Sequence, residues 1–352
     1  MSGSASLLEL RGLRTSSLKN INLAISSGEI VAVVSSRTHE RVELINAVAG
    51  LTRYDGTILI EGKPIKGLKA GNGIVGYFLH EPAPDATVLA SVTSNLKPLG
   101  FSKDEATVRA METLKSISIE ELGGKTIKEL SSFEFELFKL ACIIALSPKV
   151  VLLNEPFERL TLEERHILCQ VLRTLKQKYA IILTSKFMSN VDMIADRVLL
   201  LNEGEAIQFG RPNELIFEPT NQFVSNIICG GNLFVALSAV IIASGLALVN
   251  CSGNLIFLVP YEKGRIERVA IYPEGIKVFK QRPENITFNL IKALVHDVNE
   301  TGSEVYLQLG IVGGGKLTAR LNKTAVKILG INKEDYVYAW IDPAYIRTLI
   351  RI

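Results

Sequence analysis

A loop near the N-terminus carries the residues whose spacing most suggests chemistry. Residues 29–34 form a short, mostly apolar run that suits a buried strand, and Leu44, Ile45 and Val48 recur at helical spacing. Between such elements the pattern GxxxxGK[ST] binds phosphate: its glycines let backbone N–H groups converge, its Lys meets the negative charge and its Ser or Thr holds Mg²⁺. The loop here reads SSRTHERV. It has the length of a phosphate loop and different residues.

Only the cationic position of that pattern is retained, and its residue type is changed. Counted back from residues 49–51, the two glycines are replaced by Ser35 and Glu40, the Lys by Arg41 and the Ser by Val42. Because non-Gly residues resist positive φ angles, a loop without glycine cannot readily form the nest of amides. Two arginines and two glutamates between residues 37 and 43 offset one another, so charge does not decide. We therefore favour a turn kept for folding over a pocket for another anion near Arg41.

The composition indicates a large globular chain. With 352 residues, of which 47% are hydrophobic, the chain can bury a sizeable core and is expected to form two domains. Its 39 basic and 36 acidic residues are nearly balanced, which argues against a nucleic-acid binder. The four cysteines and four histidines are too scattered for a metal site or a disulfide framework, so we expect no metal centre.

Two segments bear on the relation to membranes. The N-terminus lacks the basic and apolar regions of a signal peptide, which favours a cytoplasmic chain. Residues 233–249 carry no charge but are slightly short of the roughly 20 residues that a spanning helix needs. A Ser-Gly pair at 244–245 favours a hairpin of buried strands there instead.

Further along, apolar strands alternate with helical segments. The run at 150–153 ends in Asn154-Glu155-Pro156, which places polar side chains at the edge where α/β sheets collect ligands. Strands are also expected at 180–184 and 197–202, with a helix at 162–178 before them. This alternation predicts a largely parallel sheet.

The order of these segments resembles the ATP-binding cassette subunits of importers. The corresponding stretches are VAVVSSRTHERVELINAVAGL, ELSSFEFELFKLACIIALSPKVVLLNEPFERL, IILTSKF and IADRVLLLNEGEAIQFGRPNELIFEP. In the family they are the phosphate loop, the LSGGQ signature with the Walker B strand, the switch histidine and the trailing strands. The resemblance covers roughly residues 7–228, and it implies an α/β, P-loop-type cassette over 1–228 whose cofactors would be ATP and Mg²⁺.

The catalytic positions that the resemblance implies are largely altered. Asn154 replaces the Walker B Asp, Ser185 replaces the switch His, and His80 aligns with the glutamine that senses metal and water. Glu155 is retained at the position of the general base. Since an amide adds no negative charge and Val42 offers no oxygen, two supports for the metal are lost. Binding of ATP and Mg²⁺ is therefore doubtful.

The signature is altered as well. It keeps Leu130 and Ser131 but has Ser132 and Phe133 in place of both glycines. In the family, cassettes dimerise head to tail, and each site joins one chain's phosphate loop to the other chain's signature. Pairing with an intact cassette would leave one site without a phosphate loop and the other with a poor signature. Loss of one transition-state donor commonly costs about 10²–10³ in rate, so efficient hydrolysis is not expected.

From residue 229 to 352 the chain reads as short strands separated by turns, including a hairpin turn at 313–315. The segment is expected to be one small all-β domain or two linked ones. It resembles the OB-like TOBE/Mop β-barrel domains that follow the cassette in sugar, sulfate and molybdate or tungstate importers, and its end is most similar to the oxyanion-binding kind.

The ligand positions of that β domain have also changed. Phe288 stands where the oxyanion-binding domains have Arg before Asn289, and Asp342 stands where they have Lys. The loss of two cations disfavours an oxyanion, which points to a role in assembly or regulation. Lys292, Thr318 and Arg320 lie nearby in sequence as further candidate contacts.

We therefore expect a non-catalytic or weakly active cassette subunit of an importer, peripheral on the cytoplasmic face of the membrane. It would pair with an intact cassette and dock a transmembrane permease, by the resemblance through residues 80–99. Two alternatives stay open. One is an active importer ATPase with unusual ligands, serving oxyanion or sugar uptake. The other is a soluble regulator or scaffold that works through its β domain.

Overall fold

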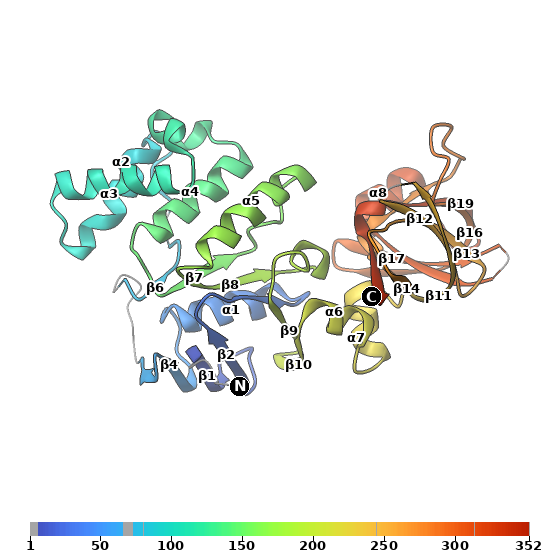
Figure 1. Cartoon of the computed structure of the whole chain (residues 1–352), viewed down its shortest axis with the longest axis horizontal. Coiled ribbons are helices and arrows are strands. Elements are labelled where there is room, and N and C mark those ends of the chain that lie inside the picture. Colours follow the sequence, from blue (N-terminus) through green and yellow to red (C-terminus); the bar gives the residue numbers. More distant parts are fainter. Residues whose placement is uncertain (1–5, 66–72, 80, 244, 313, 352) are drawn as a thin grey trace. The chain divides into compact units, whose positions relative to one another are not determined.

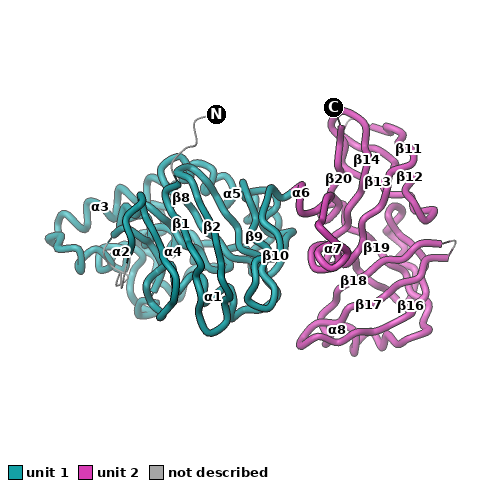
Figure 2. Tube along the Cα trace, turned by 90° about the horizontal axis from the view of Figure 1, so that it is seen from below, with its two compact units in different colours: residues 1–212 teal, residues 213–352 magenta. Residues whose placement is uncertain are grey.

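The computed structural model describes residues 6–65, 73–79, 81–243, 245–312 and 314–351. It divides into two compact units, residues 1–212 and 213–352 (Figure 2). The sequence predicts a domain boundary between residues 228 and 229. In the structure, the helix α7 (Gln222–Cys229) belongs to unit 2, although most of it lies before the predicted boundary. A compact unit and a family domain need not end at the same residue, and the boundary at 228 stays a prediction.

Unit 1 contains two sheets. The six-stranded sheet has the order β10-β9-β3-β8-β7-β6, and its neighbours from β9 to β6 run parallel while β10 pairs with β9 antiparallel. The smaller antiparallel sheet has the order β2-β1-β4-β5. The strands are β1 (Ser6–Arg14), β2 (Ile21–Ser26), β3 (Ile30–Val34), β4 (Asp55–Ile60), β5 (Lys63–Pro64), β6 (Val75–Gly76), β7 (Val150–Asn154), β8 (Ala180–Ser185), β9 (Arg197–Asn202) and β10 (Glu205–Gly210).

The helix α1 (Thr38–Val48) lies between the two sheets, whereas α5 (Leu162–Leu175) covers the other face of the large sheet (Figure 1). Leu44, Ile45 and Val48 of α1 are fully buried in one apolar cluster with residues of both sheets. Burying a Leu or Ile side chain contributes about 1.5–3 kcal/mol, so this cluster fixes α1 directly behind the loop that precedes it.

A helical part of unit 1 carries the signature residues. Its α-helices contact one another and lie away from α1 in Figure 1. They are α2 (Val88–Leu96), α3 (Lys103–Ser116) and α4 (Ser132–Ile144), joined by the short 3-10 helices η1 (Lys97–Leu99), η2 (Glu120–Gly124) and η3 (Ile127–Glu129). A fourth 3-10 helix, η4 (Met188–Asn190), follows β8.

Unit 2 is built from two five-stranded antiparallel sheets, of order β13-β12-β11-β14-β20 and β15-β19-β16-β17-β18. A single cluster of buried apolar residues includes strands of both sheets, which favours one domain over two linked ones. The elements are α6 (Pro212–Phe217), α7, β11 (Leu233–Ala243), β12 (Leu246–Cys251), β13 (Leu255–Pro260), β14 (Arg265–Ile271), η5 (Pro273–Gly275), β15 (Ile276–Phe279), β16 (Leu290–Thr301), β17 (Glu304–Ile311), β18 (Lys316–Asn322), α8 (Lys323–Leu329), β19 (Tyr336–Ile341), η6 (Pro343–Tyr345) and β20 (Ile346–Arg351).

The structure confirms the expected α/β cassette fold followed by an all-β domain, and it confirms both predicted hairpins. The uncharged segment forms the antiparallel pair β11 and β12, and the glycine-rich segment joins the antiparallel strands β17 and β18. The expectation that both strands of the uncharged hairpin are buried was wrong, because most of β11 is exposed. Within the described ranges, no helix is long and apolar enough to cross a membrane. The short helix α8 and the last strand β20 were not predicted.

Candidate functional site

The loop at the candidate phosphate site is short and has ordinary backbone angles. Residues 35–37 connect the end of β3 to the start of α1 at Thr38. Every residue from 35 to 43 is described, and none of them has a positive φ. Since a phosphate nest alternates right- and left-handed backbone angles, this loop does not have the shape of one.

Two backbone amides of the loop are bonded within the protein. The Ser35 N–H donates to the carbonyl oxygen of Ser185 at 3.2 Å, and the Arg37 N–H donates to Ser35 Oγ at 3.0 Å. In a phosphate loop such amides are directed at the ligand. Here the first bond ties the loop to the end of β8, and the second closes the turn on itself.

Glu40, at the position of the second glycine, is completely buried. Its Oε2 accepts a hydrogen bond from Ser35 Oγ at 2.6 Å, and its Oε1 accepts one from the Gly204 N–H at 2.8 Å. The Arg37 guanidinium lies 4.0 Å from the same carboxylate. A buried carboxylate is costly without such partners. The hydrogen bonds to Glu40 therefore hold the loop against the turn at Gly204.

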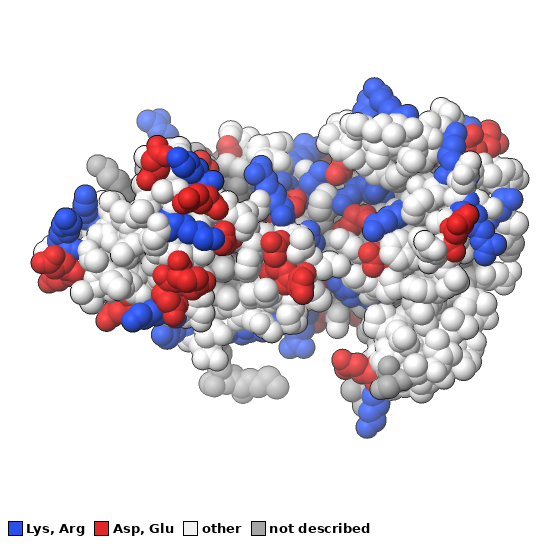
Figure 3. Space-filling model, turned by 90° about the horizontal axis from the view of Figure 1, so that it is seen from above, with Lys and Arg blue, Asp and Glu red and all other residues white. Residues whose placement is uncertain are grey.

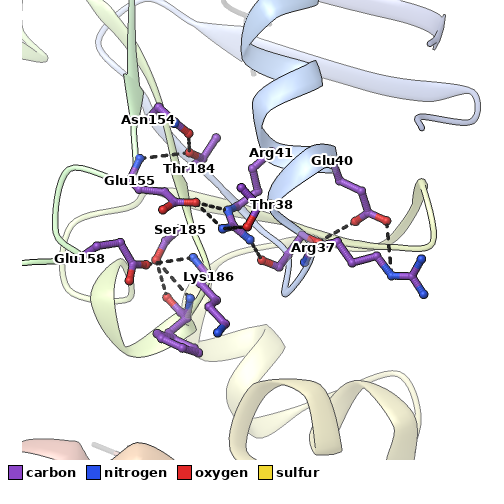
Figure 4. Close-up of polar contacts among 12 residues, drawn as sticks. Arg37, Thr38, Glu40, Arg41, Asn154, Glu155, Glu158, Thr184, Ser185 and Lys186 are labelled. Carbon is purple, nitrogen blue, oxygen red and sulfur yellow. Dashed lines mark hydrogen bonds and ion pairs between the residues drawn. The ribbon is translucent and has the colours of Figure 1, made fainter. Parts of the chain in front are cut away.

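Arg41, which replaces the phosphate-binding Lys, is only 1% exposed. All three guanidinium nitrogens donate inside the protein: Nε to Glu155 Oε1 at 2.8 Å, one terminal nitrogen to the Ser35 carbonyl, and the other to Glu155 and to Thr38 Oγ1. Figure 4 shows Arg41 pointing toward Glu155 and Thr38, while Glu40 points to the other side toward Arg37. The retained cation therefore pairs with the retained carboxylate.

This pairing corrects one expectation from sequence. The charges of the loop do not simply offset one another, because Arg41 pairs with Glu155 and Arg37 also pairs with Glu203 at 2.8 Å. The Glu155 side chain is 26% exposed. Glu155 itself has a left-handed backbone, with φ of 52°.

The candidate metal-supporting and switch positions are also bonded internally. Thr184 Oγ1 donates to the Asn154 amide oxygen at 2.7 Å and accepts from the Glu155 N–H at 3.2 Å. The buried Ser185 Oγ donates to the Phe187 carbonyl and accepts from the Phe187 N–H, both at 3.1 Å. The oxygen atoms that could face a metal ion or a phosphate thus have partners already. Val42 provides no oxygen ligand either. The residues present therefore do not form a binding site for Mg²⁺ and a nucleoside triphosphate.

The signature residues lie apart from this cluster, at the start of α4. Ser131 is the N-cap: its Oγ accepts from the Glu134 N–H at 3.1 Å, and Glu134 accepts from the Ser131 N–H at 2.8 Å. Leu130 precedes the cap and Ser132 is the first residue of the helix. Phe133 lines an apolar hollow together with Leu137 and Ile167, which belongs to α5. The signature therefore serves as a helix cap, and its role toward a partner stays a prediction.

Glu43 of α1 receives a group of hydroxyl donors from residues 15–17. Thr15 and Ser16 Oγ donate to it, and Ser17 donates through both Oγ at 2.8 Å and N–H at 3.1 Å. Desolvation alone would raise the pKa of Glu43, but these hydrogen bonds together lower the pKa to about 2. Residues 15–17 are thereby fastened to α1.

In unit 2 the former ligand positions hold the fold together. The Asn289 side chain accepts from the Leu258 N–H at 2.7 Å and donates to the Leu258 carbonyl at 2.9 Å, and Asp342 accepts from the Ala344 N–H at 3.0 Å. Phe288 is exposed. The further candidates also contact protein groups: Thr318 Oγ1 donates to the Gly230 carbonyl, Arg320 lies near Glu274 and Glu304, and Lys292 lies over the Tyr336 ring.

The structure brings several candidate residues together at the carboxyl edge of the parallel sheet. Ser35, Glu40 and Arg41 lie with Glu155 and Ser185, whereas His80 lies outside the described residues. The partners that close the site, chiefly Thr38, Thr184 and Gly204, were not predicted. Thr184 was visible next to Ser185 in Thr184-Ser185-Lys186, but nothing in the sequence showed which way its hydroxyl points.

Figure 3 shows acidic and basic side chains interspersed over the drawn face of unit 1, without a field of one sign.

Comparison with known families identifies the two domains. Residues 18–158 match the family model described as ABC transporter, and residues 287–347 match the model of the TOBE domain. The chain contains an ATP-binding cassette domain followed by a TOBE domain. The matched cassette segment contains the altered phosphate loop, the signature and the Asn154-Glu155 pair, so the changes described above lie within recognisable cassette positions.

Several curated proteins are similar to this cassette protein over most of their length. The spermidine/putrescine import ATP-binding protein of Haemophilus influenzae is 26% identical over 292 residues, which cover 79% of this chain and 78% of that protein. The molybdate/tungstate import ATP-binding protein of Pyrococcus horikoshii is 25% identical over 328 residues, or 92% of each chain.

Solved cassette structures share the fold. The cbiO1 protein of Clostridium perfringens, part of the ABC transporter complex cbiONQ, aligns with a TM-score of 0.54 and 25% identity over 60% of this chain and 90% of its own. A nucleotide-free ATP-binding cassette from an ABC transporter aligns with a TM-score of 0.57 and 16% identity, over 63% of this chain and 98% of its own.

The ion pair between Arg41 and Glu155 should contribute measurably to stability. We expect Arg41→Met and Glu155→Ala each to lower the free energy of unfolding by about 1–3 kcal/mol, because each leaves a largely buried charge without its partner. The double variant should lose less than the sum of the two. Denaturant unfolding of all four proteins gives the coupling energy. The exposed pair Lys149 and Glu61 is the control, with a coupling below about 1 kcal/mol; equal coupling in both cycles would contradict the prediction.

Glu43 should make stability depend on acid pH. Its pKa of about 2 in the folded protein lies below the model value of 4.5. The stabilisation is therefore complete above about pH 4.5 and is lost as pH falls toward 2. Glu43→Gln should reduce the free energy of unfolding at neutral pH, with a difference from wild type that shrinks over this window. Glu112→Gln, an exposed position on α3, is the control, and a pH-independent difference for Glu43→Gln would contradict the assignment.

Proposed function

We propose that this chain is a non-catalytic cassette subunit of an ABC importer, which pairs with an intact cassette and docks a transmembrane permease. The observation that carries the proposal is the closure of the phosphate site by Arg41. Its guanidinium is bonded to Glu155, to Thr38 and to the Ser35 carbonyl. For Arg41 to bind phosphate, its ion pair with Glu155 would first have to separate, which would leave the partly buried Glu155 carboxylate without its cation.

The lack of Mg²⁺ ligands at positions 42 and 154 also supports a non-catalytic role. In phosphoryl transfer, a hydroxyl of the phosphate loop and a Walker B carboxylate hold Mg²⁺, and the metal neutralises charge that develops on the phosphates. Here Val42 has no oxygen, and the Asn154 amide oxygen accepts from Thr184. Glu155, at the general-base position, lies against Arg41 instead of facing a free site. We infer that hydrolysis in the complex is carried out by the other cassette.

The proposed role in import is supported by the curated relatives and by the cassette fold. Both curated relatives described above are import ATP-binding proteins, although one is named for polyamines and the other for oxyanions. No cargo is therefore proposed. The chain would work on the cytoplasmic face of the membrane, where α2 and the segment before it, residues 81–99, would receive the permease. Phe133 and the Glu155 edge would face the partner cassette.

The TOBE domain has a structural part in this proposal. Asn289 clamps the backbone of Leu258, and Asp342 caps the turn at Ala344, so neither side chain is directed at an oxyanion. The domain would stabilise the assembly instead of sensing a ligand. Two rival functions remain: an active ATPase that uses Arg41 and Glu155 in an opened site, and a soluble scaffold without a permease.

The full chain should show no ATP turnover of its own. With Mg²⁺ and ATP, phosphate release by the wild-type protein should equal that of Glu155→Gln and of the exposed control variant Glu163→Gln, and calorimetric titration should show no tight binding. The reason is that the loop does not form a phosphate nest, that Arg41 is paired with Glu155 and that Val42 offers no oxygen to a metal ion. Turnover that Glu155→Gln abolishes and Glu163→Gln retains would establish the active-ATPase alternative.

Purification from native membranes tests the partners. The tagged full chain should recover an intact cassette and a permease. Ala90→Glu places a charge on an exposed position of α2 and should release the permease, whereas Val108→Glu at an exposed position of α3 should retain it. Recovery of neither partner by the wild-type chain would favour the scaffold.

A further inference from the structure

One strand of unit 2 has an edge that the fold leaves open. β11 pairs with β14 only through its first three residues, Leu233, Phe234 and Val235. From residue 236 to 243 it pairs with β12 along one edge, and within the described ranges no strand pairs with the other edge. Along this stretch, backbone N–H and C=O groups therefore alternate toward an unoccupied side.

The open edge is apolar on both faces. On the inner face Ile241 is 61% exposed, although its direct neighbour across the ladder, Ala247 of β12, is fully buried. On the outer face Val240 is 61% exposed, and Leu248, opposite Val240, is exposed too. Ile242, which lies at a shift of register, is 55% exposed. Apolar side chains thus reach this edge on both faces of the sheet and are exposed there.

The edge lacks the charged residues and prolines with which proteins commonly prevent strand addition. Residues 236–243 read ALSAVIIA and contain no charge, no Pro and no Gly. The ladder with β12 has two shifts of register, between Ala236 and Ser238 and between Ile241 and Ala243, near the two ends of the stretch. The residues between them, 238–241, pair with β12 in regular register.

The kind of occupant follows from the backbone. A helix can cover one face of the edge but cannot pair with its N–H and C=O groups. A lipid surface would leave those groups unsatisfied in hydrocarbon, which costs several kcal/mol for each group. Only another strand satisfies the backbone and extends both apolar faces together.

We propose that this edge pairs antiparallel with the same strand of a second copy of the chain. A two-fold axis places each side chain of the strand opposite a side chain of an identical strand, so any charge would meet like charges close by. With no charge from 236 to 243, the strand is compatible with its own copy. The pairing joins the two β12-β11 ladders into one continuous sheet. It involves unit 2 alone and does not depend on the proposed cassette pairing.

Ultracentrifugation of the full-length chain, without nucleotide and over a range of concentrations, tests this pairing. We expect a dimer whose dissociation constant rises at least tenfold in Ile242→Lys, since the variant places a charge in a strand edge that must pack against an apolar strand of the other copy. Ile328→Lys is the matched control, because Ile328 is an 80% exposed apolar residue on α8. Hydrogen exchange should show that the amides of 236–243 become more protected as wild-type protein associates, and that Ile242→Lys abolishes this change.

Three results would overturn the proposal. The first is a monomer at every concentration. The second is a dimer that Ile242→Lys weakens no more than Ile328→Lys does, without added protection of 236–243, which would assign the contact to another surface such as the cassette. The third is a monomer that binds phosphatidylcholine vesicles through Ile242, which would assign the hairpin to a lipid surface.

Discussion

A buried guanidinium governs the arrangement of the altered nucleotide site. Arg41 lies on α1, which the apolar cluster between the two sheets holds in place, so its side chain must find partners where it is. A carboxylate and a carbonyl supply them, from Glu155 at the end of β7 and from Ser35 at the end of β3. The same contacts determine the position of the loop and the direction of Glu155, and they occupy the guanidinium of Arg41. The site is therefore a folded part of the core and no longer an open cradle.

The cluster consists of two linked halves. On one side of the loop, Glu40 connects Ser35 with the turn at Gly204; on the other side, Arg41 connects Ser35 with Glu155. Ser35 joins the halves through its hydroxyl, carbonyl and amide groups, the last of which bonds to Ser185. Four segments that are distant in sequence thus meet in a network whose members are mostly buried and hydrogen-bonded, the condition under which polar groups inside a protein stabilise it.

The sequence was sufficient for the fold and for the location of the site. Apolar runs of the right period predicted the parallel strands, and the ordered cassette motifs grouped Ser35, Arg41, Asn154 and Ser185. It was insufficient for the state of the site, because composition shows which charges are present and not which of them meet. The ion pair between Arg41 and Glu155 joins residues far apart in the chain, and the clamp by Asn289 depends on a rotamer; both arise from tertiary packing. The final strand β20 was missed because it belongs to the first sheet of unit 2, which is completed only when the chain returns to it.

The hydrogen bond from Gly204 to Glu40 has a consequence for how this cassette can change over time. A glycine at position 40 would be the first step toward a phosphate loop, but by itself it would leave the Gly204 N–H and the Ser35 hydroxyl without their acceptor. Each unsatisfied buried group costs about 1–3 kcal/mol, so the step would be harmful before it could be useful. A return to nucleotide binding would need several substitutions together, and single mutations under selection for stability would tend to preserve the closed form.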